Sequence, residues 1–238
     1  MAILKIYNPN QPLNIDTSCQ VWLDGNDADT FTLDGTYVDQ WDDKSGFGRD
    51  VSNGNADVTR PTYDSATGRV TFTAANNTFL QSAAFASALS QPNIVFIVYK
   101  KTGSLSSIEI IFDGIGGSER HTFSTVSSFF KFGAGTSIAG TATNANDNIH
   151  IALFNEASSE YWINGISVAS GNAGDDNLSG VILGATYNFG GDADAEIMEV
   201  IVYSADISNA DRDKITGYLA DKWDITATTD FKGYVLQI

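Results

Sequence analysis

Three aspartates stand close together near the start of the chain, in a turn that also holds a glycine and an asparagine. The segment Asp24–Thr30 reads DGNDADT and places Asp24, Asp27 and Asp29 within six residues. Carboxylate and amide oxygens are the ligands that calcium prefers, and the ion takes about 6–8 of them. The same residue types also favour turns by bonding to their own backbone. The segment is a candidate calcium site, although the full EF-hand spacing and its closing glutamate are missing.

A second polar stretch, residues 185–194, carries aromatic side chains and reads ATYNFGGDAD. A sugar site needs an exposed aromatic face that stacks on the ring and polar groups that bond its hydroxyls. Two aromatic and three polar side chains here meet that need. The predicted ligand-binding residues are Tyr187, Asn188, Phe189, Asp192 and Asp194. The alternative is that Phe189 packs beneath its own loop.

Carboxylates that could cleave a glycosidic bond are poorly placed. Retaining glycosidases need two carboxyl groups about 5–5.5 Å apart, which alternate positions of a strand can supply. Glu196 and Glu199 differ by three, so we predict that they point to opposite sides of a strand. Asp194 and Glu196 can share a face, but they lie where the strand begins. Asp43 and Asp50 flank a glycine-rich loop and are expected to hold it through backbone N–H groups.

The histidines and known catalytic motifs add little to the case for an enzyme. His150 alternates with Ile149 and Ile151, which predicts that its side chain faces outward, and His121 lies in a separate strand candidate. No serine elbow, zinc-protease motif or phosphate loop is present. We therefore predict a protein that is not an enzyme, with a glycosidase or lyase as the alternative.

The net charge of the chain disfavours some classes of binding partner. Its 238 residues include 13 Lys and Arg against 29 Asp and Glu, a net charge of −16. That excess opposes binding to nucleic acid and to anionic membranes. The N-terminal residues MAILKIYNPNQPLN lack the features of a signal peptide, and no apolar run approaches the roughly 20 residues of a membrane helix. The lone Cys19 excludes an intrachain disulfide and is expected to be buried.

Short apolar runs separated by Gly, Asn, Asp and Ser predict an all-β chain. Their number and spacing favour an antiparallel two-sheet sandwich or jelly roll. Residues 94–99 read IVFIVY and indicate a strand buried on both faces. Residues 197–203 read IMEVIVY and indicate another strand, with Met198, Val200 and Val202 on one face.

One short helix is expected near the C-terminus. Ser208 can cap its first backbone N–H groups, and Asp211 completes a capping box. Ile215, Leu219 and Trp223 follow at helical spacing, so one side of the helix is apolar. The four tryptophans lie in or beside apolar segments and are expected in the core.

Several of these segments together resemble the concanavalin A-like lectin/glucanase superfamily, in its laminin-G-like jelly-roll branch of phage and bacterial proteins. They are VWLDGNDADT (21–30), QWDDKSGFGRD (40–50), RPTYD (60–64), IFDG (111–114), YWINGISV (161–168), LGA (183–185) and EVIVYSADISNADRDKITGYLADKW (199–223). The resemblance implies a curved two-sheet sandwich whose concave face or loop rim often binds carbohydrate, sometimes with calcium. We predict an extended N-terminal lead-in at 1–19, the jelly-roll domain at 20–225, and a C-terminal arm or edge strand at 226–238.

The resemblance and the missing secretion signal lead to one functional hypothesis. We expect a non-catalytic, lectin-like module on a virion surface, as a phage fibre, spike or decoration protein that contacts host glycans. Its partners would be glycans on a host cell surface, other virion proteins and further copies of itself, without nucleic acid or membrane. The alternatives are a structural cement protein of a capsid or tail and a polysaccharide-degrading enzyme. An extracellular protein exported without a visible signal peptide is the other expected location.

Overall fold

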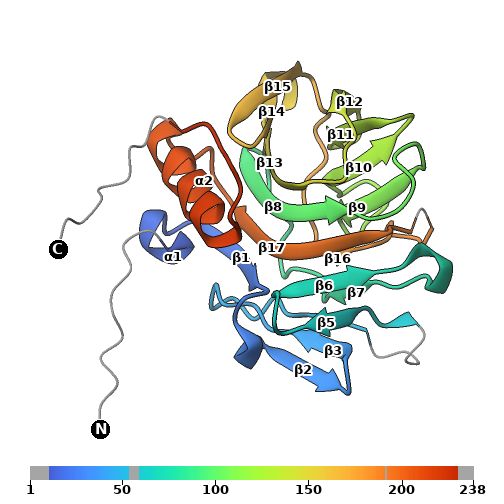
Figure 1. Cartoon of the computed structure of the whole chain (residues 1–238). Coiled ribbons are helices and arrows are strands. Elements are labelled where there is room, and N and C mark those ends of the chain that lie inside the picture. Colours follow the sequence, from blue (N-terminus) through green and yellow to red (C-terminus); the bar gives the residue numbers. More distant parts are fainter. Residues whose placement is uncertain (1–10, 54–58, 191, 230–238) are drawn as a thin grey trace, which may run out of the picture.

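The computed structural model describes residues 11–53, 59–190 and 192–229 (Figure 1). Two α-helices, α1 (Pro12–Ile15) and α2 (Asn209–Trp223), accompany seventeen β-strands in the described chain. The strands are β1 Cys19–Asp24, β2 Phe31–Asp34, β3 Tyr37–Trp41, β4 Val51–Ser52, β5 Thr62–Asp64, β6 Arg69–Phe72, β7 Leu80–Ser82, β8 Asn93–Lys101, β9 Glu109–Asp113, β10 Thr122–Val126, β11 Phe129–Gly133, β12 Ser137–Ala142, β13 Asp147–Phe154, β14 Ser159–Ile163, β15 Ile166–Gly171, β16 Ile182–Leu183 and β17 Ala195–Tyr203. The prediction of an all-β chain is confirmed.

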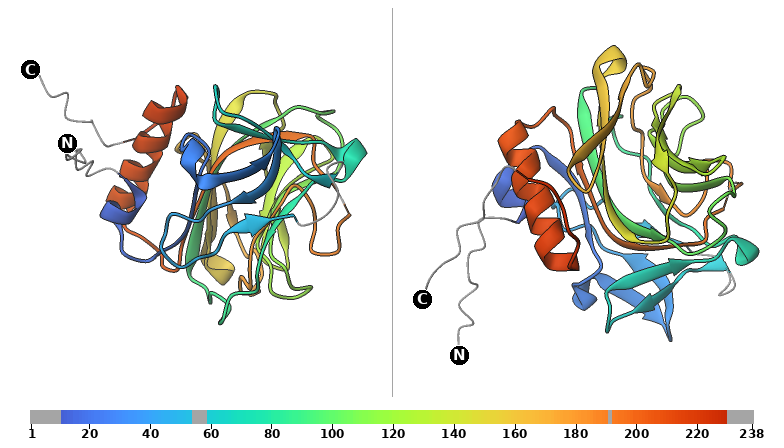
Figure 2. Two further views of the ribbon diagram at one scale, coloured as in Figure 1. Left: turned by 90° about the horizontal axis from the view of Figure 1, so that it is seen from below. Right: turned by 45° about the horizontal axis from the view of Figure 1, so that its top comes forward.

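The strands hydrogen-bond as one large, nearly closed antiparallel sheet. One run of neighbours is β15–β14–β13–β8–β17, and β17 continues to both β1 and β6. The other run is β12–β11–β10–β9–β16–β7–β4–β3–β2. β5 joins the two runs, because it pairs with β6 on one side and bridges to β3 on the other. Figure 2 shows the curved strands around the space that the main core fills.

The central strands of the first run, β8, β13 and β17, are buried on both faces because α2 covers their outer side (Figures 1 and 2). Val95, Ile97 and Tyr99 of β8 belong to the main core, whereas their neighbours in the strand pack in a second core beneath α2. Ser208 caps α2, with its hydroxyl 3.1 Å from the backbone nitrogen of Asp211. The predictions of a doubly buried strand and of a capped helix are therefore confirmed.

A β-bulge in β17 corrects the predicted faces of that strand. Ile197 pairs with Tyr99 and Glu199 pairs with Val98, so Met198 is the extra residue. Met198 consequently packs beneath α2, while Val200 and Val202 lie in the main core. The three do not share one face, because a bulge shifts the period of two by one residue.

His150 is buried, contrary to the prediction that it faces outward. Its ring lies in the main core, stacked 4.2 Å from Tyr99 and with Nδ1 2.6 Å from the hydroxyl of Tyr161. Its neighbours Ile149 and Ile151 are buried too, in the core beneath α2. Alternation therefore misled the prediction because both faces of this strand are covered.

Both predicted terminal segments are described only in part. The predicted lead-in includes α1, whose Pro12 carbonyl accepts a hydrogen bond from the hydroxyl of Tyr203. Residues 230–238 of the predicted C-terminal arm lie outside the described residues, whereas Thr228 bonds through its backbone nitrogen to the carbonyl of Asn164. Neither described helix is long and apolar enough to cross a membrane.

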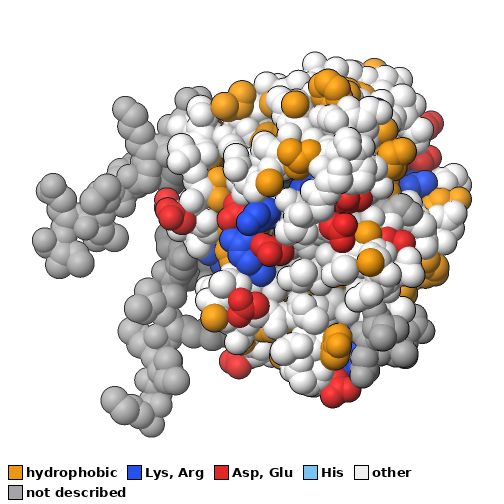
Figure 3. All heavy atoms as spheres, turned by 45° about the vertical axis from the view of Figure 1, so that its right-hand side comes forward, with side chains coloured by type: hydrophobic (Ala, Val, Ile, Leu, Met, Phe, Trp, Pro, Cys, Tyr) orange, Lys and Arg blue, Asp and Glu red, His pale blue; other side chains and the backbone are white. Residues whose placement is uncertain are grey.

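Figure 3 shows that hydrophobic side chains on one face of the molecule form small, separate patches. Lys and Arg side chains lie beside Asp and Glu side chains on the same face. Among the described residues drawn on this face, no large apolar area of the kind that marks a stable protein interface is present.

Candidate functional site

The loop after β16 projects three consecutive side chains into solvent. Thr186 closes the turn, because its backbone nitrogen donates to the carbonyl of Gly190 at 3.0 Å and its hydroxyl contacts the same carbonyl at 2.7 Å. The backbone nitrogen of Phe189 donates back to the Thr186 carbonyl at 2.8 Å. Tyr187, Asn188 and Phe189 are exposed on this closed turn. The turn therefore holds two aromatic rings outward at fixed positions.

Tyr187 is held against a buried ion pair. The Asp113 carboxylate accepts from Arg120 at 2.8 and 2.6 Å and from the backbone nitrogen of Tyr187 at 3.1 Å. The Arg120 guanidinium lies 4.8 Å from the centre of the Tyr187 ring. Burial raises the pKa of Asp113, and the Arg120 charge and the backbone donors offset part of that increase. Two charge-assisted hydrogen bonds thus orient the guanidinium beneath the ring.

A groove of about 320 Å³ opens beside this pair. Its lining includes Arg120, Thr122 and Ser124 together with Ser137, Asp176 and Gly117. A Cβ added to Gly117 would lie 3.4 Å from the Tyr187 ring, so the ring borders the groove. Hydroxyl groups and a guanidinium therefore line one hollow, and an aromatic ring lies at its edge.

Phe189 borders a second groove, of about 450 Å³, on the other side of the loop. Its ring lies 4.6 Å from that of Phe79, and both rings line the hollow. The other lining residues are Ser52, Asn53, Gln81, Ser82 and Ala83. Phe189 does not pack beneath its own loop, since 49% of it is exposed.

The five predicted ligand-binding residues separate into two groups. Tyr187, Asn188 and Phe189 lie together on the exposed turn. Asp194 instead accepts a hydrogen bond from the backbone nitrogen of Ala74 at 2.8 Å and supports a neighbouring loop. Asp192 is half-buried, its Oδ1 has no hydrogen-bond partner among the described atoms, and burial raises its pKa. Neither aspartate lines a groove.

Sequence reasoning missed the residues that complete the two hollows. Arg120, Asp113 and Phe79 belong to segments that come near residue 187 only because β7, β16 and β9 are neighbours. The two-residue strand β16 carries no pattern that reveals those partners. A signal for Asp113 existed in the IFDG segment, but the sequence did not indicate that it binds Arg120.

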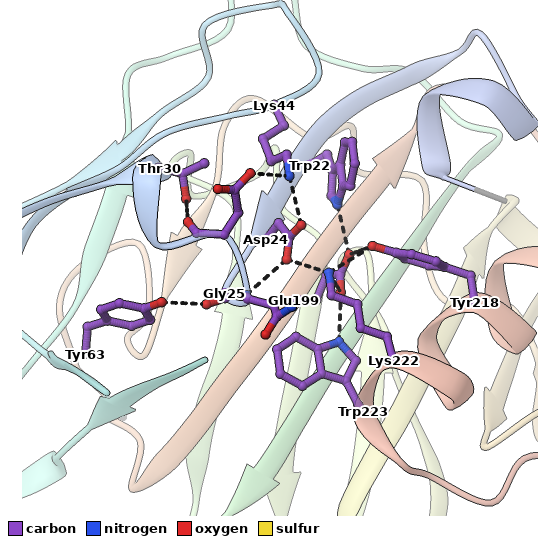
Figure 4. Close-up of polar contacts among 12 residues, drawn as sticks. Trp22, Asp24, Gly25, Thr30, Lys44, Tyr63, Glu199, Tyr218, Lys222 and Trp223 are labelled. Atoms are coloured by element: carbon purple, nitrogen blue, oxygen red, sulfur yellow. Dashed lines mark hydrogen bonds and ion pairs between the residues drawn. The ribbon is translucent and has the colours of Figure 1, made fainter. Parts of the chain in front are cut away.

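Two of the three predicted calcium ligands are held by lysines (Figure 4). Lys44 Nζ lies 2.9 Å from Asp24 Oδ2 and 2.6 Å from Asp27 Oδ2, and Lys222 Nζ contacts Asp24 Oδ1. Asp29 is exposed on the adjoining turn. Burial alone would raise the pKa of Asp24, but the two ammonium groups lower it overall. Within the described residues, no group of three or more acidic, His or Cys side chains is arranged to hold a metal.

Calcium at this turn remains a prediction with a direct test. An ion would have to displace Lys44 Nζ from between two carboxylates. Binding predicts a higher melting temperature in calcium than in EDTA, because a ligand of the native state stabilises it by mass action. Differential scanning fluorimetry measures this difference. Equal melting temperatures in the two buffers would show that the turn does not bind calcium.

The same network continues to Glu199, the buried centre of the contact between α2 and the sheet (Figure 4). Its Oε1 accepts from Trp22 Nε1 and the Tyr218 hydroxyl, each at 2.9 Å. Its Oε2 lies 2.7 Å from Trp223 Nε1 and 2.8 Å from Lys222 Nζ. Burial raises the pKa of Glu199, and the Lys222 ammonium offsets part of that increase. This carboxylate attaches α2 to β1 and β17.

The acidic loop at 43–50 behaves as predicted. Asp43 Oδ1 accepts from the backbone nitrogens of Trp22 and Ser45 at 2.8 and 2.9 Å, and Asp43 Oδ2 from that of Arg49 at 3.1 Å. Asp50 Oδ1 accepts from the backbone nitrogen of Asp43 at 2.8 Å. Both carboxylates therefore hold the loop through backbone N–H groups.

The carboxylates weighed for glycoside cleavage are bound to other groups. The bulge places Glu196 and Glu199 on the same face, because they pair with Lys100 and Val98, two residues apart on β8. The prediction of opposite faces is thus wrong. Glu196 nevertheless forms an ion pair with Arg69 at 2.8 Å, whereas Glu199 is enclosed beneath α2. The two do not form an open pair around a substrate.

No protein-family model matches the sequence, and no curated protein matches it in sequence. The chain is similar in fold to a Trypanosoma rangeli sialidase, with a TM-score of 0.56 at 10% identity over 89% of this chain and 34% of that one. It is also similar to the binding domain of botulinum neurotoxin DC in complex with SialylT, with a TM-score of 0.60 at 10% identity, covering 86% and 51%.

A third structure is the same toxin domain in complex with rat synaptotagmin II, with a TM-score of 0.56 at 12% identity, covering 87% and 52%. The chain spans about a third of the sialidase and about half of the toxin domain. At these identities the likeness shows a shared β-rich fold. Both an enzyme and binding domains are among the neighbours.

Proposed function

We propose that this protein recognises carbohydrate without cleaving it, on the surface that surrounds residues 186–190. The observation that carries this proposal is the closed turn with Tyr187 and Phe189, each beside a groove lined by polar groups. Aromatic faces next to hydroxyl, amide and guanidinium groups match the mixed surface of a sugar ring. Neighbours of the same fold are described in complex with sialic acid and with SialylT, which supports a glycan as the ligand.

Binding without catalysis is supported by the state of the carboxylates. Asp194, Glu196 and Glu199 are engaged with Ala74, Arg69 and Lys222. A glycosidase needs one carboxyl group as a proton donor and a second as a nucleophile or base. The groups engaged here would have to leave their partners before they could act.

The setting that we propose is a virion surface, where the chain acts as a fibre, spike or decoration protein and contacts host glycans. The sequence motifs resemble concanavalin A-like jelly rolls, and two runs of strands stacked about one core suit that architecture. Self-association and contacts with other virion proteins belong to the same proposal, as does the alternative of export to the extracellular space.

A structural cement protein is the second candidate, favoured by one apolar area. Leu105, Ile108 and Phe129 are 39%, 65% and 43% exposed. Their loops are joined because Thr143 bonds to the carbonyls of Leu105 and Ser128. Such a patch suits a contact with another subunit.

Tyr187→Ala is expected to weaken glycan binding about tenfold or more. An aromatic ring that a bound glycan covers contributes roughly 1.5–3 kcal/mol to binding, and about 1.4 kcal/mol corresponds to a factor of ten. A glycan array followed by titration of the bound glycans measures the effect. Tyr37→Ala is a matched control, because Tyr37 is 36% exposed, Tyr187 is 37% exposed, and each ring lies near an arginine.

Three other results would change the proposal. If the wild type binds no glycan on the array, carbohydrate recognition is wrong and the cement function is favoured. If polysaccharides incubated with the protein gain reducing ends, the protein is an enzyme. Equal losses in Tyr187→Ala and Tyr37→Ala would place the binding surface elsewhere.

A further inference from the structure

We propose that the ligand is an uncharged oligosaccharide that crosses the loop at 186–190 and occupies both grooves at once. This inference rests on the proposed function and specifies its ligand. The binding site would then be a surface that spans both grooves, and its affinity would depend on the length and the charge of the glycan.

Both grooves lie on the same face of the sheet. Val51, Leu80 and Phe123 point into the main core. Their strand neighbours Ser52, Gln81, Thr122 and Ser124 line the grooves. Because successive side chains alternate across a strand, the lining residues project from the face opposite the core.

The loop lies between the grooves. The strands under the Phe189 groove are β4 and β7, and those under the Tyr187 groove are β9, β10 and β11. β16, which leads into the loop, pairs with β7 on one side and β9 on the other. Three strand spacings separate β7 from β10, about 14 Å in all. That span exceeds one sugar ring, so a ligand that occupies both grooves needs several linked units.

The backbone of Phe189 supports a role for its ring. Its φ is +58°, in the left-handed region that bulky residues rarely adopt and that glycine adopts without cost. The chain nevertheless has a phenylalanine here, with 49% of it exposed. Residues in sparsely populated backbone conformations cluster at active sites and at sites that clamp a ligand.

The charges of the grooves favour a neutral ligand. Arg120 and Asp176 are the charged residues that line the first groove, and the guanidinium is already paired with Asp113. The second groove is lined by no charged residue within the described chain. The net charge of −16 further repels anionic glycans. A sialylated or uronic acid unit would therefore lose solvation without gaining an unpaired cation.

Calorimetric titration with neutral malto-, cello- and manno-oligosaccharides, from mono- to hexasaccharide, tests the proposal. We expect the affinity of the binding series to rise at least about tenfold with length and then to level off. Phe189→Gly should remove most of this gain and leave the melting temperature nearly unchanged, since glycine suits its backbone. Phe47→Gly is the control, because Phe47 is an exposed loop phenylalanine that lines neither groove.

The outcomes separate this inference from the proposed function. Binding that is as tight for a monosaccharide as for a hexasaccharide overturns the extended site while carbohydrate recognition stands. Tighter binding of a sialylated glycan than of its neutral counterpart overturns the preference for uncharged ligands. If no sugar in the panel or on the glycan array binds, both proposals fail.

Discussion

Lys222→Met is expected to lower the free energy of unfolding by about 3–5 kcal/mol, the usual cost of removing one partner from a buried ion pair. Lys222 Nζ contacts Asp24, Glu199 and the Tyr218 hydroxyl, and its side chain is only 13% exposed. Methionine retains much of the apolar stem but supplies no charge. Asp24 and the fully buried Glu199 would then face each other with Lys44 as the remaining cation near Asp24.

Denaturant unfolding, followed by tryptophan fluorescence, measures this loss. Lys214→Met is the control on the same helix, because Lys214 is 37% exposed and pairs with the nearby Asp211. Exposed pairs of this kind contribute about 0.2–1 kcal/mol. If the two variants lose equal stability, the buried network does not hold α2 to the sheet.

The protein is expected to lose stability as the pH falls from about 7 to about 5, because two buried histidines resist protonation. Burial lowers the pKa of His121 and of His150 from 6.5 to about 3. Between these values the unfolded chain binds protons that the folded chain excludes. Stability is therefore fully present above pH 6.5 and is lost as the pH falls below it. At about pH 5 each histidine costs roughly 2 kcal/mol, since one pKa unit corresponds to about 1.4 kcal/mol.

His150→Phe isolates this contribution. The phenyl ring should occupy the space between Tyr99 and Phe130, and the variant should lose about 2 kcal/mol less between pH 7 and pH 5 than the wild type. Urea unfolding at both pH values gives the difference, which is independent of any constant cost of losing the Tyr161 hydrogen bond. An unchanged pH dependence would mean that His150 is protonated in the folded state. Raised carboxyl pKa values, as at Asp113, act with the opposite sign, because there the folded chain binds protons that the unfolded chain releases.

Local patterns were enough for the elements that depend on their own residues. The all-β class, the doubly buried strand at 94–99 and the cap at Ser208 follow from burial, alternation and hydrogen bonding within short segments. The pinning of the loop at 43–50 followed in the same way, because Asp43 bonds to backbone groups that lie mostly nearby in the chain.

Sequence reasoning failed for residues whose surroundings are set by a segment far away in the chain. His150 was predicted to be exposed because alternation implies that one face of the strand meets solvent. In the structure α2 covers the outer side of this strand, so both faces are buried. Glu196 and Glu199 were assigned to opposite faces because a bulge at Met198 leaves no mark in composition. Asp24 and Asp27 suggested a cation, and the cations that contact them are lysines from residues 44 and 222.

The candidate site was likewise predictable from the sequence only in part. Residue types alone predicted that Tyr187, Asn188 and Phe189 share an exposed loop, and their contact with a sugar stays a prediction. Only the tertiary structure placed Arg120 beneath Tyr187, Phe79 beside Phe189 and a groove on each side. The physical reason is that propensity and alternation act over a few residues, whereas strand order brings together side chains that are far apart in the sequence.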